Sequence, residues 1–331
     1  MAFYLGIDGG GSKTACAVGD ESHLIATVTA GPSNIVRVGE TAARESLHQA
    51  VGQACAAAGI TTQQIRRICA GAAGAGRPET ASIVHKILAE ILQGEIDVVG
   101  DGPIALEAAF GAGPGVIVIA GTGSISYGRD ANGRTARAGG WGFAVSDEGS
   151  AHWIGRAAIA ALLRANGTEA RIQSDSVLWS IITKVWNVSS FEKLIPIANA
   201  SPPADFSAIF PAVLTSAEQG DATSQGILEH AGRELAELAA SVIHRLFPRR
   251  EPARATSGQS LDAEHTVPVA MAGGVFRHAA VVRQTFYNEV RNRCPEAALN
   301  LQVVDPVLGA LQLARETRNT QHSNERHGTR A

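Results

Sequence analysis

The sequence predicts an α/β protein built from two similar halves. Each half opens with a strand, a glycine-rich turn and a second strand, adds a third strand, and then changes to helical spacing of its apolar residues. The two openings barely match residue by residue, so the repeat is one of element order. With 331 residues, 45% of them hydrophobic and 18% charged, the chain can bury an interior large enough for two ordinary domains.

The first half begins with a predicted hairpin. Its strands are expected at residues 2–7 and 15–19, joined by a tight glycine turn, and a third strand is expected at 24–30. Apolar residues at helical spacing, with a glycine just past the end, predict a helix over 41–59. The elements that follow are a strand at 66–71, a helix at 78–92, a strand at 96–100 and a helix at 103–110.

The second half starts in the same way. Strands at 115–120 and 125–128 flank a turn at 121–124, and a third strand is expected at 135–138. The later elements are a mostly helical stretch at 151–247, a strand at 267–272, a helix at 279–293, a strand at 301–304 and a helix at 306–317. Residues 248–266 and the polar tail at 319–331 lack periodicity, so we expect a loop and a flexible tail there.

Charge and cysteine content exclude several classes of protein. A net charge of −3 argues against a protein whose main task is to bind nucleic acid or an anionic membrane. The four cysteines lie far apart without a C-x-x-C pair, which disfavours a zinc ribbon, a redox dithiol and a disulfide framework. No secretion signal and no stretch of about 20 apolar residues is present. We therefore expect a protein of the reducing cytoplasm with neither a nucleic-acid nor a membrane partner.

Two glycine-rich turns are candidate phosphate sites. Residues 6–14 resemble a P-loop, but they carry one extra residue before Lys13, and a strand follows where a P-loop needs a helix. Residues 121–124 fail as a dinucleotide-binding turn for the same reason. A turn rich in glycine can still hold phosphate through successive N–H groups and neighbouring hydroxyls. We interpret residues 9–14 as a first nest and 121–124 as a second nest, the alternative being two ordinary hairpin turns.

Two carboxylates are placed for phosphoryl transfer, which needs a metal for the phosphates and a base for the acceptor hydroxyl. Asp8 ends the first strand directly before the first nest, which suits contact with Mg²⁺ through water. Asp101 follows the strand at 96–100, at the edge where open α/β sheets place their ligands. The alternative for Asp101 is a helix cap before Pro103. Asp97 is a competing carboxylate, but it lies inside the strand or at its entrance.

These residues belong to an ordered set of motifs that resembles the N-acetylglucosamine kinases of the BadF/BadG/BcrA/BcrD ATPase family, within the actin, heat-shock chaperone and hexokinase superfamily. The most specific part is GGWGFAVSDEGSAHWIG at 139–155. The other matching stretches are GIDGGGSKT at 6–14, GPSN at 31–34, GD at 100–101, GVIVIAGTGS at 115–124, AEQGD at 217–221, AGGV at 272–275 and PVLGALQLA at 306–314.

The resemblance implies two ribonuclease-H-like lobes with ATP and sugar in the cleft between them. The N-terminal lobe would comprise residues 1–112 together with the C-terminal helix at 306–317, and the second lobe residues 113–305 with a helical insertion. A homodimer is also expected, because members of the family often dimerise.

The resemblance also implies the binding residues. Contacts to ATP phosphates are expected from Gly10, Gly11, Ser12, Lys13 and Thr14 in the first nest and from Gly121, Thr122, Gly123 and Ser124 in the second. The adenosine pocket would involve Ala217, Gly273 and Gly274, and the sugar would contact Asn34, Asp101, Gly140, Trp141 and Asp147. Trp141 could instead be a core residue, and Asp147 with Glu148 could cap the next helix.

The implied activity is ATP-dependent phosphorylation of the 6-hydroxyl of an amino sugar, with Asp101 as general base and N-acetylglucosamine as the first choice. Ile125 stands where animal N-acetylglucosamine kinases carry an asparagine that touches substrate. Glucosamine and N-acetylmuramic acid therefore stay open as substrates. Functions of other classes are an iron–sulfur activator of a dehydratase and a non-catalytic protein that binds sugar and ATP. The glycine cluster at 71–76 is assigned no role beyond a loop at a strand end.

Overall fold

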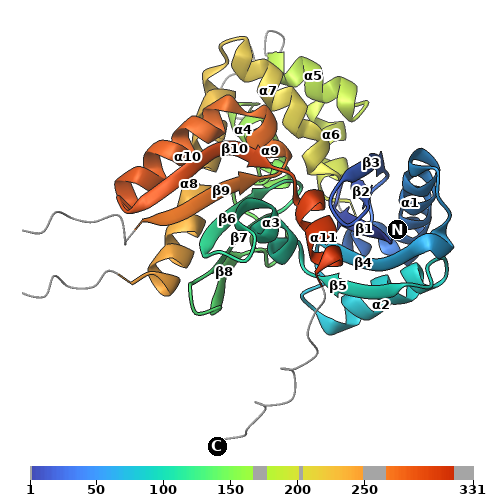
Figure 1. The fold of residues 1–331 in the computed structure, drawn as a ribbon. Coiled ribbons are helices and arrows are strands. Elements are labelled where there is room, and N and C mark those ends of the chain that lie inside the picture. The colour runs from blue at the N-terminus through green and yellow to red at the C-terminus, as the bar shows by residue number, and fades with distance from the viewer. Residues whose placement is uncertain (1, 167–176, 201–203, 249–265, 317–331) are drawn as a thin grey trace, which may run out of the picture.

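The computed structural model describes residues 2–166, 177–200, 204–248 and 266–316. It contains two five-stranded mixed sheets with helices packed on them. In Figure 1 the first sheet lies on the right, the second on the left, and helix α11 lies between them. The predicted class, an α/β protein of two similar lobes, is confirmed.

The first sheet has the strand order β3-β2-β1-β4-β5. Its strands are β1 (Phe3–Gly9), β2 (Thr14–Gly19), β3 (Leu24–Ala30), β4 (Ile65–Ala72) and β5 (Glu95–Val99). The first three are antiparallel, and β4 and β5 are added in parallel. Helices α1 (Ile35–Ala58) and α2 (Pro78–Ala89) bury apolar residues such as Leu47 and Ile87 on this sheet, and η1 (Thr62–Gln64) leads into β4.

The second sheet repeats this arrangement in the order β10-β9-β6-β7-β8. Its strands are β6 (Gly115–Ala120), β7 (Ser124–Arg129), β8 (Thr135–Gly139), β9 (Val267–Ala272) and β10 (Ala297–Val304). In both sheets the first strand of the lobe is central, the second and third follow on one side, and the fourth and fifth on the other. The repeat of element order is therefore a repeat of topology.

Helices fill the stretch between β8 and β9. They are α4 (Ala151–Asn166), α5 (Val177–Val185), α6 (Phe191–Ala198), η2 (Phe206–Ile209), α7 (Phe210–Glu218) and α8 (Ala222–Leu246). The long helix α8 packs on the second sheet, where Gly128 has no side chain and leaves room for Val242 and Leu246. Two further helices, α9 (Gly274–His278) and α10 (Ala280–Arg293), connect β9 to β10.

Two helices lie between the sheets, α3 (Asp101–Phe110) and α11 (Pro306–Arg315). They cross so closely at Gly309 that an added Cβ would lie 2.0 Å from the carbonyl oxygen of Ile104. Ile104 packs on the α11 side, whereas Leu106 of the same helix packs with Ile117 of the second sheet. The helix α3 therefore contacts the cores of both lobes.

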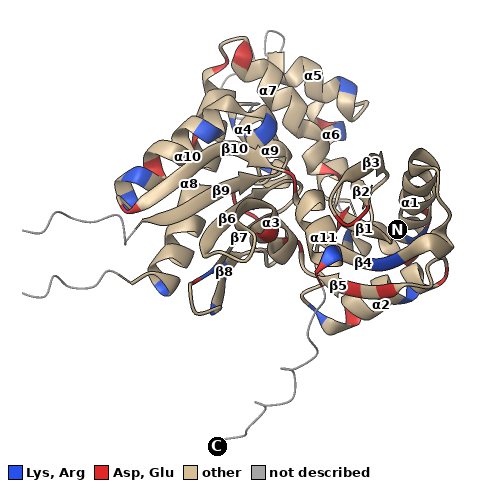
Figure 2. Ribbon diagram, in the orientation of Figure 1, with Lys and Arg blue, Asp and Glu red and all other residues tan. Residues whose placement is uncertain are grey.

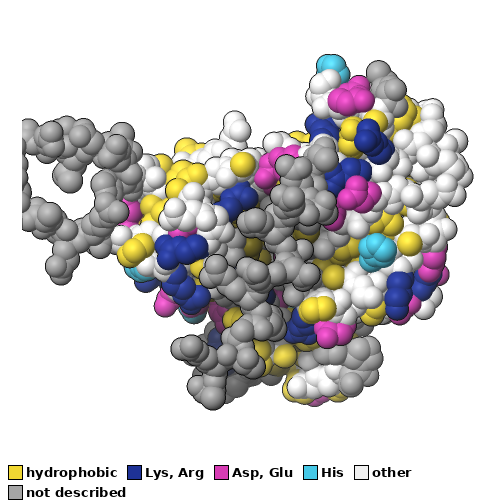
Figure 3. Space-filling model, turned by 60° about the horizontal axis from the view of Figure 1, so that its bottom comes forward, with side chains coloured by type: hydrophobic (Ala, Val, Ile, Leu, Met, Phe, Trp, Pro, Cys, Tyr) yellow, Lys and Arg dark blue, Asp and Glu magenta, His cyan; other side chains and the backbone are white. Residues whose placement is uncertain are grey.

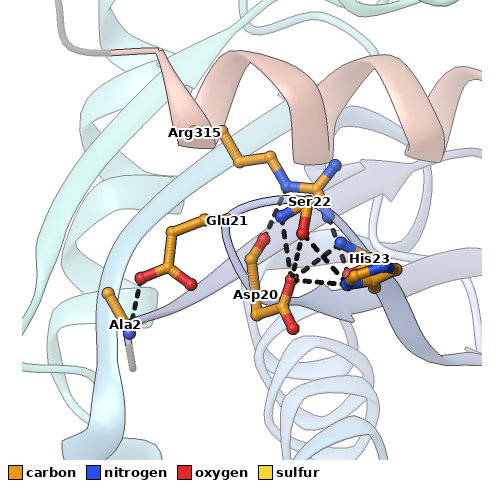
Figure 4. Close-up of polar contacts among 6 residues, drawn as sticks. All are labelled: Ala2, Asp20, Glu21, Ser22, His23 and Arg315. Atoms are coloured by element: carbon orange, nitrogen blue, oxygen red, sulfur yellow. Dashed lines mark hydrogen bonds and ion pairs between the residues drawn. The ribbon is translucent and has the colours of Figure 1, made fainter.

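Although α11 follows the last strand of the second sheet, it is anchored to the first. A Cβ at Gly6 would lie 2.3 Å from the backbone nitrogen of Leu311. Figure 4 shows the other anchor, where the Arg315 guanidinium donates hydrogen bonds of 2.8 Å to the carbonyl oxygens of Asp20 and His23 in the β2–β3 turn. These contacts support our proposal that the C-terminal helix belongs with the N-terminal lobe.

Several predicted boundaries differ from the structure. Helix α1 begins at Ile35 rather than at 41, because Asn34 caps an extra first turn that is set off by a kink at Gly39 (φ 79°, ψ 167°). Helix α3 begins at Asp101 rather than 103, since a proline is compatible with the first turn of a helix. Strand β10 begins at Ala297 rather than 301, and the five-residue helix α9 was not predicted.

Helix α11 ends at Arg315, and the remainder of the predicted helix at 317 lies outside the described residues. The predicted tail at 319–331 and most of the predicted loop at 248–266 also lie outside them.

None of the helices in the described ranges combines the length and the apolar character needed to cross a membrane. On the face shown in Figure 3, acidic, basic and hydrophobic side chains are interspersed.

Candidate active site

The first nest is the hairpin turn between β1 and β2, and it exposes Ser12 and Lys13. The turn is closed by a 2.9 Å hydrogen bond from Gly10 N–H to the Lys13 carbonyl. The Gly10 carbonyl in turn accepts the N–H groups of Ser33 and Asn34 at 3.1 and 3.2 Å. Asn34, a predicted sugar contact, is thereby held beside the first nest, where its side chain also accepts Val36 N–H at 3.1 Å.

The second nest faces the first. Ser12 Oγ and Thr122 Oγ1, which are 110 residues apart in the chain, lie 2.7 Å from each other. An added Cβ at Gly11 would lie 3.1 Å from the Thr122 side chain. The N-terminus of α4 lies against the same turn, because Ala151 N–H donates to the Gly121 carbonyl at 2.9 Å. The fold therefore places the two predicted phosphate turns in direct contact.

Two other predicted nucleotide residues use their hydroxyls elsewhere. Thr14 is fully buried, with Oγ1 2.7 Å from the Gly31 carbonyl oxygen and 2.8 Å from Ser33 Oγ. Ser124 Oγ donates to the Glu148 carbonyl at 2.7 Å. Both hydroxyls fix neighbouring loops, and both residues are buried, so neither side chain is available to a phosphate.

The predicted adenosine residues are divided between two elements. Gly273 precedes α9 at φ 99°, and an added Cβ there would lie 2.3 Å from the Ala120 carbonyl oxygen. Since β6 and β9 are parallel neighbours, Gly273 and Gly274 lie beside the end of β6, where the second nest begins. Ala217 lies near the end of α7, where its carbonyl accepts a 3.1 Å hydrogen bond from Gln225.

Three carboxylates gather beside the first nest: Asp8 at the end of β1, Asp101 at the start of α3 and Asp305 directly before α11. Burial raises the pKa of Asp8 to about 7, and the negative charges of Asp101 and Asp305 add to the rise, which Lys13 opposes. Asp305 was not among the predicted residues. The available signal was its position in the sequence, because Asp305 follows a predicted strand and lies directly before Pro306, just as Asp101 follows a predicted strand and lies shortly before Pro103.

This carboxylate group fits a divalent metal. Carboxylate oxygens are the ligands that Mg²⁺ prefers, and a buried carboxylate beside two like charges is stabilised in its ionised form by a cation. Asp8 and Asp305 are the residues that would hold the ion, directly or through water.

Asp101 occupies the first turn of α3, where Gly102 N–H donates to its carboxylate at 3.0 Å. Burial raises its pKa, while the backbone N–H groups and the charge of Arg137 act in the opposite direction. The approach of α3 depends on Gly71, since an added Cβ there would lie 2.2 Å from Ile104. This gives the first glycine of the 71–76 cluster a role. The competing carboxylate, Asp97, pairs with Arg67 at 3.3 Å.

The GGWG loop (residues 139–150) connects β8 to α4. Gly140 has φ 70°, and its missing side chain leaves room for Ile125, which would lie 2.9 Å from an added Cβ. Asp147 is only 8% exposed, and the N–H groups of Ser124 and Gly142 hydrogen-bond its carboxylate. Burial, followed by the charges of Glu148 and Asp101, raises its pKa to about 6.

The structure decides two of the alternatives for this loop. The first turn of α4 is capped by Ser150, whose hydroxyl accepts Trp153 N–H at 3.1 Å, so Asp147 and Glu148 are not the cap. Trp141 is not a core residue, because it is 61% exposed. The Arg137 guanidinium lies over its ring, 3.9 Å from the centroid.

A side-chain contact links the two lobes near Asn34. Arg37 of α1 forms an ion pair with Asp205 and donates a 3.1 Å hydrogen bond to Ser207 at η2. The helical part of the second lobe is thereby connected to the loop that holds a predicted sugar contact.

Comparison with known proteins gives the family. The model of the BadF/BadG/BcrA/BcrD ATPase family matches residues 5–314. The chain belongs to this family. Membership of the BadF/BadG/BcrA/BcrD ATPase family supports ATP as the nucleotide.

Two curated relatives align with nearly the whole chain. An N-acetylmuramic acid/N-acetylglucosamine kinase from Clostridium acetobutylicum is 30% identical over 322 residues, covering 95% of this chain and 99% of the relative. An N-acetyl-D-glucosamine kinase from Dictyostelium discoideum is 27% identical over 325 residues, covering 94% and 97%. Both relatives are kinases, which confirms the prediction of a phosphotransferase.

A solved structure shares the fold. It comes from Chromobacterium violaceum, is described as a candidate N-acetylglucosamine kinase, and superposes with a TM-score of 0.71 at 24% identity, covering 95% of this chain and 99% of that chain. At this identity the likeness concerns the fold alone. It confirms the actin/hexokinase-like ATPase fold that the BadF/BadG/BcrA/BcrD resemblance implied.

Proposed function

We propose that this protein is an ATP-dependent kinase for the 6-hydroxyl of an amino sugar, with N-acetylglucosamine as its preferred substrate. The observation that carries the proposal is the contact between the two nests through Ser12 and Thr122, next to Asp8 and Asp101. Anion-binding turns, a metal-compatible carboxylate group and a candidate base are the parts that phosphoryl transfer needs. The names of the two curated relatives support an amino sugar as the acceptor.

In this proposal the phosphates of ATP bind between the two nests. The 2.7 Å separation of Ser12 Oγ and Thr122 Oγ1 leaves no space for a phosphate. Nucleotide binding therefore separates the two hydroxyls, and each becomes a donor to phosphate oxygens alongside the N–H groups of its own turn. Mg²⁺ beside Asp8 and Asp305 would neutralise phosphate charge.

Asp101 acts on the acceptor. A general base must lie within hydrogen-bond reach of the proton that it removes, and a raised pKa strengthens a carboxylate in this role. Its place at the start of α3, between the lobes, lets it orient the 6-hydroxyl towards the terminal phosphate. Asn34, Gly140, Trp141 and Asp147 would hold the rest of the sugar, with Ile125 packed behind Gly140.

The two functions of other classes have less support. An iron–sulfur activator needs thiolates at a surface that two subunits share. All four cysteines are buried. A non-catalytic protein would need the nests but would have no use for Asp101. The homodimer and the cytoplasmic location stay predictions, and light scattering measures the former directly.

A coupled assay with ATP, Mg²⁺ and a panel of amino sugars tests the proposal. We expect turnover with N-acetylglucosamine and a product phosphorylated at position 6 by NMR. Asp101→Asn is expected to keep sugar binding and to lower kcat by at least about 100-fold, the usual scale for loss of a general base. Asp97→Asn is the matched control, because its carboxylate pairs with Arg67. Near-normal turnover of Asp101→Asn would contradict the assignment of the base.

A further inference from the structure

A histidine, a cysteine and a glutamate meet in the second lobe. They are His244 in the last turn of α8, Cys294 at the end of α10 and Glu296 directly before β10. One ligand atom from each side chain lies within 4.8 Å of the other two. We call these residues the His–Cys–Glu group. His244 and Cys294 are 50 residues apart in the chain, so no metal-binding motif is visible in the sequence.

A short turn holds two members of the group. Ala297 N–H donates a 2.9 Å hydrogen bond to the Cys294 carbonyl, which closes a β-turn with Pro295 in its second position. Proline is favoured at this position because its ring fixes φ. The Glu296 carbonyl accepts Val267 N–H at 2.9 Å, which ties the turn to the start of β9. Cys294 and Glu296 are therefore held in place before any ligand binds.

The distances within the group suit a tetrahedral metal ion. Cys294 Sγ lies 3.7 Å from His244 Nε2. Ligand atoms on a tetrahedral Zn²⁺, with Zn–S about 2.3 Å and Zn–N about 2.0 Å, lie roughly 3.5 Å apart. Cys294 and one carboxylate oxygen of Glu296 are buried, whereas His244 is exposed. A bound ion would therefore have protein on one side and solvent on the other.

The ligand types select the metal. A thiolate and an imidazole favour Zn²⁺ over Mg²⁺ and Ca²⁺, which prefer oxygen ligands. Binding would release the thiol proton to solvent, and the thiolate and carboxylate would then balance the charge of the ion. This balance matters because the last turns of α8 and α10 also carry Arg245, Arg291 and Arg293. The basic positions towards the ends of both helices are visible in Figure 2.

The position of the group separates it from the candidate active site. Strands β6 and β9 are parallel, and the second nest follows the end of β6. Glu296 accepts the N–H group of Val267, which is the first residue of β9, so the group lies near the opposite end of the sheet. An ion at this place would fasten the last turn of α8 to the turn between α10 and β10. Its effect would be on stability.

We propose that His244, Cys294 and Glu296 bind one Zn²⁺ ion that stabilises the second lobe. Three protein ligands leave one position for water, so the ion is removable by a chelator, unlike the ion of a closed site with four protein ligands. The site is distinct from the Mg²⁺ site proposed at Asp8 and Asp305, and it does not depend on the proposed function.

A cobalt titration tests the ligands. Co²⁺ binds the same nitrogen and sulfur ligands as Zn²⁺, and a thiolate ligand gives it a charge-transfer absorption in the near ultraviolet. We expect the chelator-treated whole chain to develop this band up to one equivalent of Co²⁺, and to lose it on addition of Zn²⁺ but not of Mg²⁺. Cys294→Ser should abolish the band. The matched control is Cys55→Ser, which changes a buried cysteine of the first lobe and should keep the band.

A second comparison measures affinity and stability. Loss of an outer-shell partner lowers metal affinity by about 10–100-fold, so loss of a ligand in His244→Gln should weaken Zn²⁺ binding by more than about 100-fold. Zn²⁺ should raise the urea midpoint of the parent protein, followed by circular dichroism, but not that of His244→Gln. His230→Gln is the matched control, because His230 is another exposed histidine of α8 and pairs with Glu234 at 3.0 Å.

The absence of the charge-transfer band in the parent protein, or its persistence in Cys294→Ser, overturns the proposal. Equal stabilisation of the parent and His244→Gln by Zn²⁺ also overturns it, since the ion would then bind elsewhere. If Cys294→Ser does not fold, the Co²⁺ titration of His244→Gln takes its place, and an unchanged affinity in that variant contradicts the proposal. None of these readouts requires turnover of a sugar, so the result is independent of the proposed function.

Discussion

Acid should destabilise the second lobe through one buried histidine, His152. Its side chain is 7% exposed and packs between the rings of Phe143 and Phe206, with ring centroids 5.0 and 5.2 Å away. Burial lowers the pKa of His152 from 6.5 to about 4, and the charges of Arg37 and Arg156 contribute in the same direction. Its backbone N–H donates to the Thr122 carbonyl at 3.3 Å, which ties this residue to the second nest.

The sign of the effect follows from proton uptake. Between pH 6.5 and pH 4 the unfolded chain binds a proton at His152 and the folded chain does not, so stability is lost as the pH falls through this window. A shift of about 2.5 units corresponds to roughly 3 kcal/mol in total, at about 1.36 kcal/mol per unit. Between pH 7 and pH 5 the loss from this one group is about 2 kcal/mol.

The variant His152→Phe isolates this contribution. It keeps an aromatic ring between Phe143 and Phe206 but cannot titrate. Tryptophan fluorescence during urea unfolding is a suitable probe, because all four tryptophans lie between residues 141 and 186, within the second lobe, and so report on this lobe. Other groups titrate equally in both proteins, so the loss of stability from pH 7 to pH 5 should be about 2 kcal/mol smaller in the variant. Equal losses in the two proteins would refute the reasoning.

Three further perturbations test the fold and the site. Gly6→Ala places a Cβ 2.3 Å from the Leu311 backbone nitrogen and should lower the free energy of unfolding in urea by about 1–3 kcal/mol or more. The control Gly52→Ala lies in open space on α1 and should raise the free energy of unfolding by about 0.5–1 kcal/mol. Equal effects of the two variants would contradict the packing of α11 on β1. Arg37→Ala removes the ion pair with Asp205 that links the lobes, so we expect the free energy of unfolding to fall by less than about 1 kcal/mol. We also expect a larger radius of gyration by small-angle scattering. An unchanged radius of gyration would show that this ion pair does not hold the lobes together. Asp305→Asn should raise the Mg²⁺ concentration for half-maximal activity, and superimposable Mg²⁺ curves would place Asp305 outside the metal site.

Short-range patterns in the sequence predicted much of the fold. Alternating apolar residues, glycine turns and helical spacing are local properties, so both hairpins, the order of elements and the rejection of a P-loop followed from them. The errors fell where local pattern is weak. Five residues are too few for the periodicity of α9 to be visible, and the kink at Gly39 separated the first turn of α1 from the rest of the helix.

The sequence by itself determined which turns and carboxylates were candidates, because glycine clusters and strand-end aspartates can be read one segment at a time. Only the tertiary structure decided which of them meet. The contact of Ser12 with Thr122, the closeness of Asp305 to Asp8, and the place of Arg137 between Asp101 and Trp141 all join segments that are distant in the chain. The structure also decided that the Thr14 hydroxyl serves a neighbouring loop. Such pairings depend on how the two sheets and helix α11 pack against one another. Packing between segments that are distant in the chain produces no periodic pattern in the sequence, so it cannot be predicted one segment at a time.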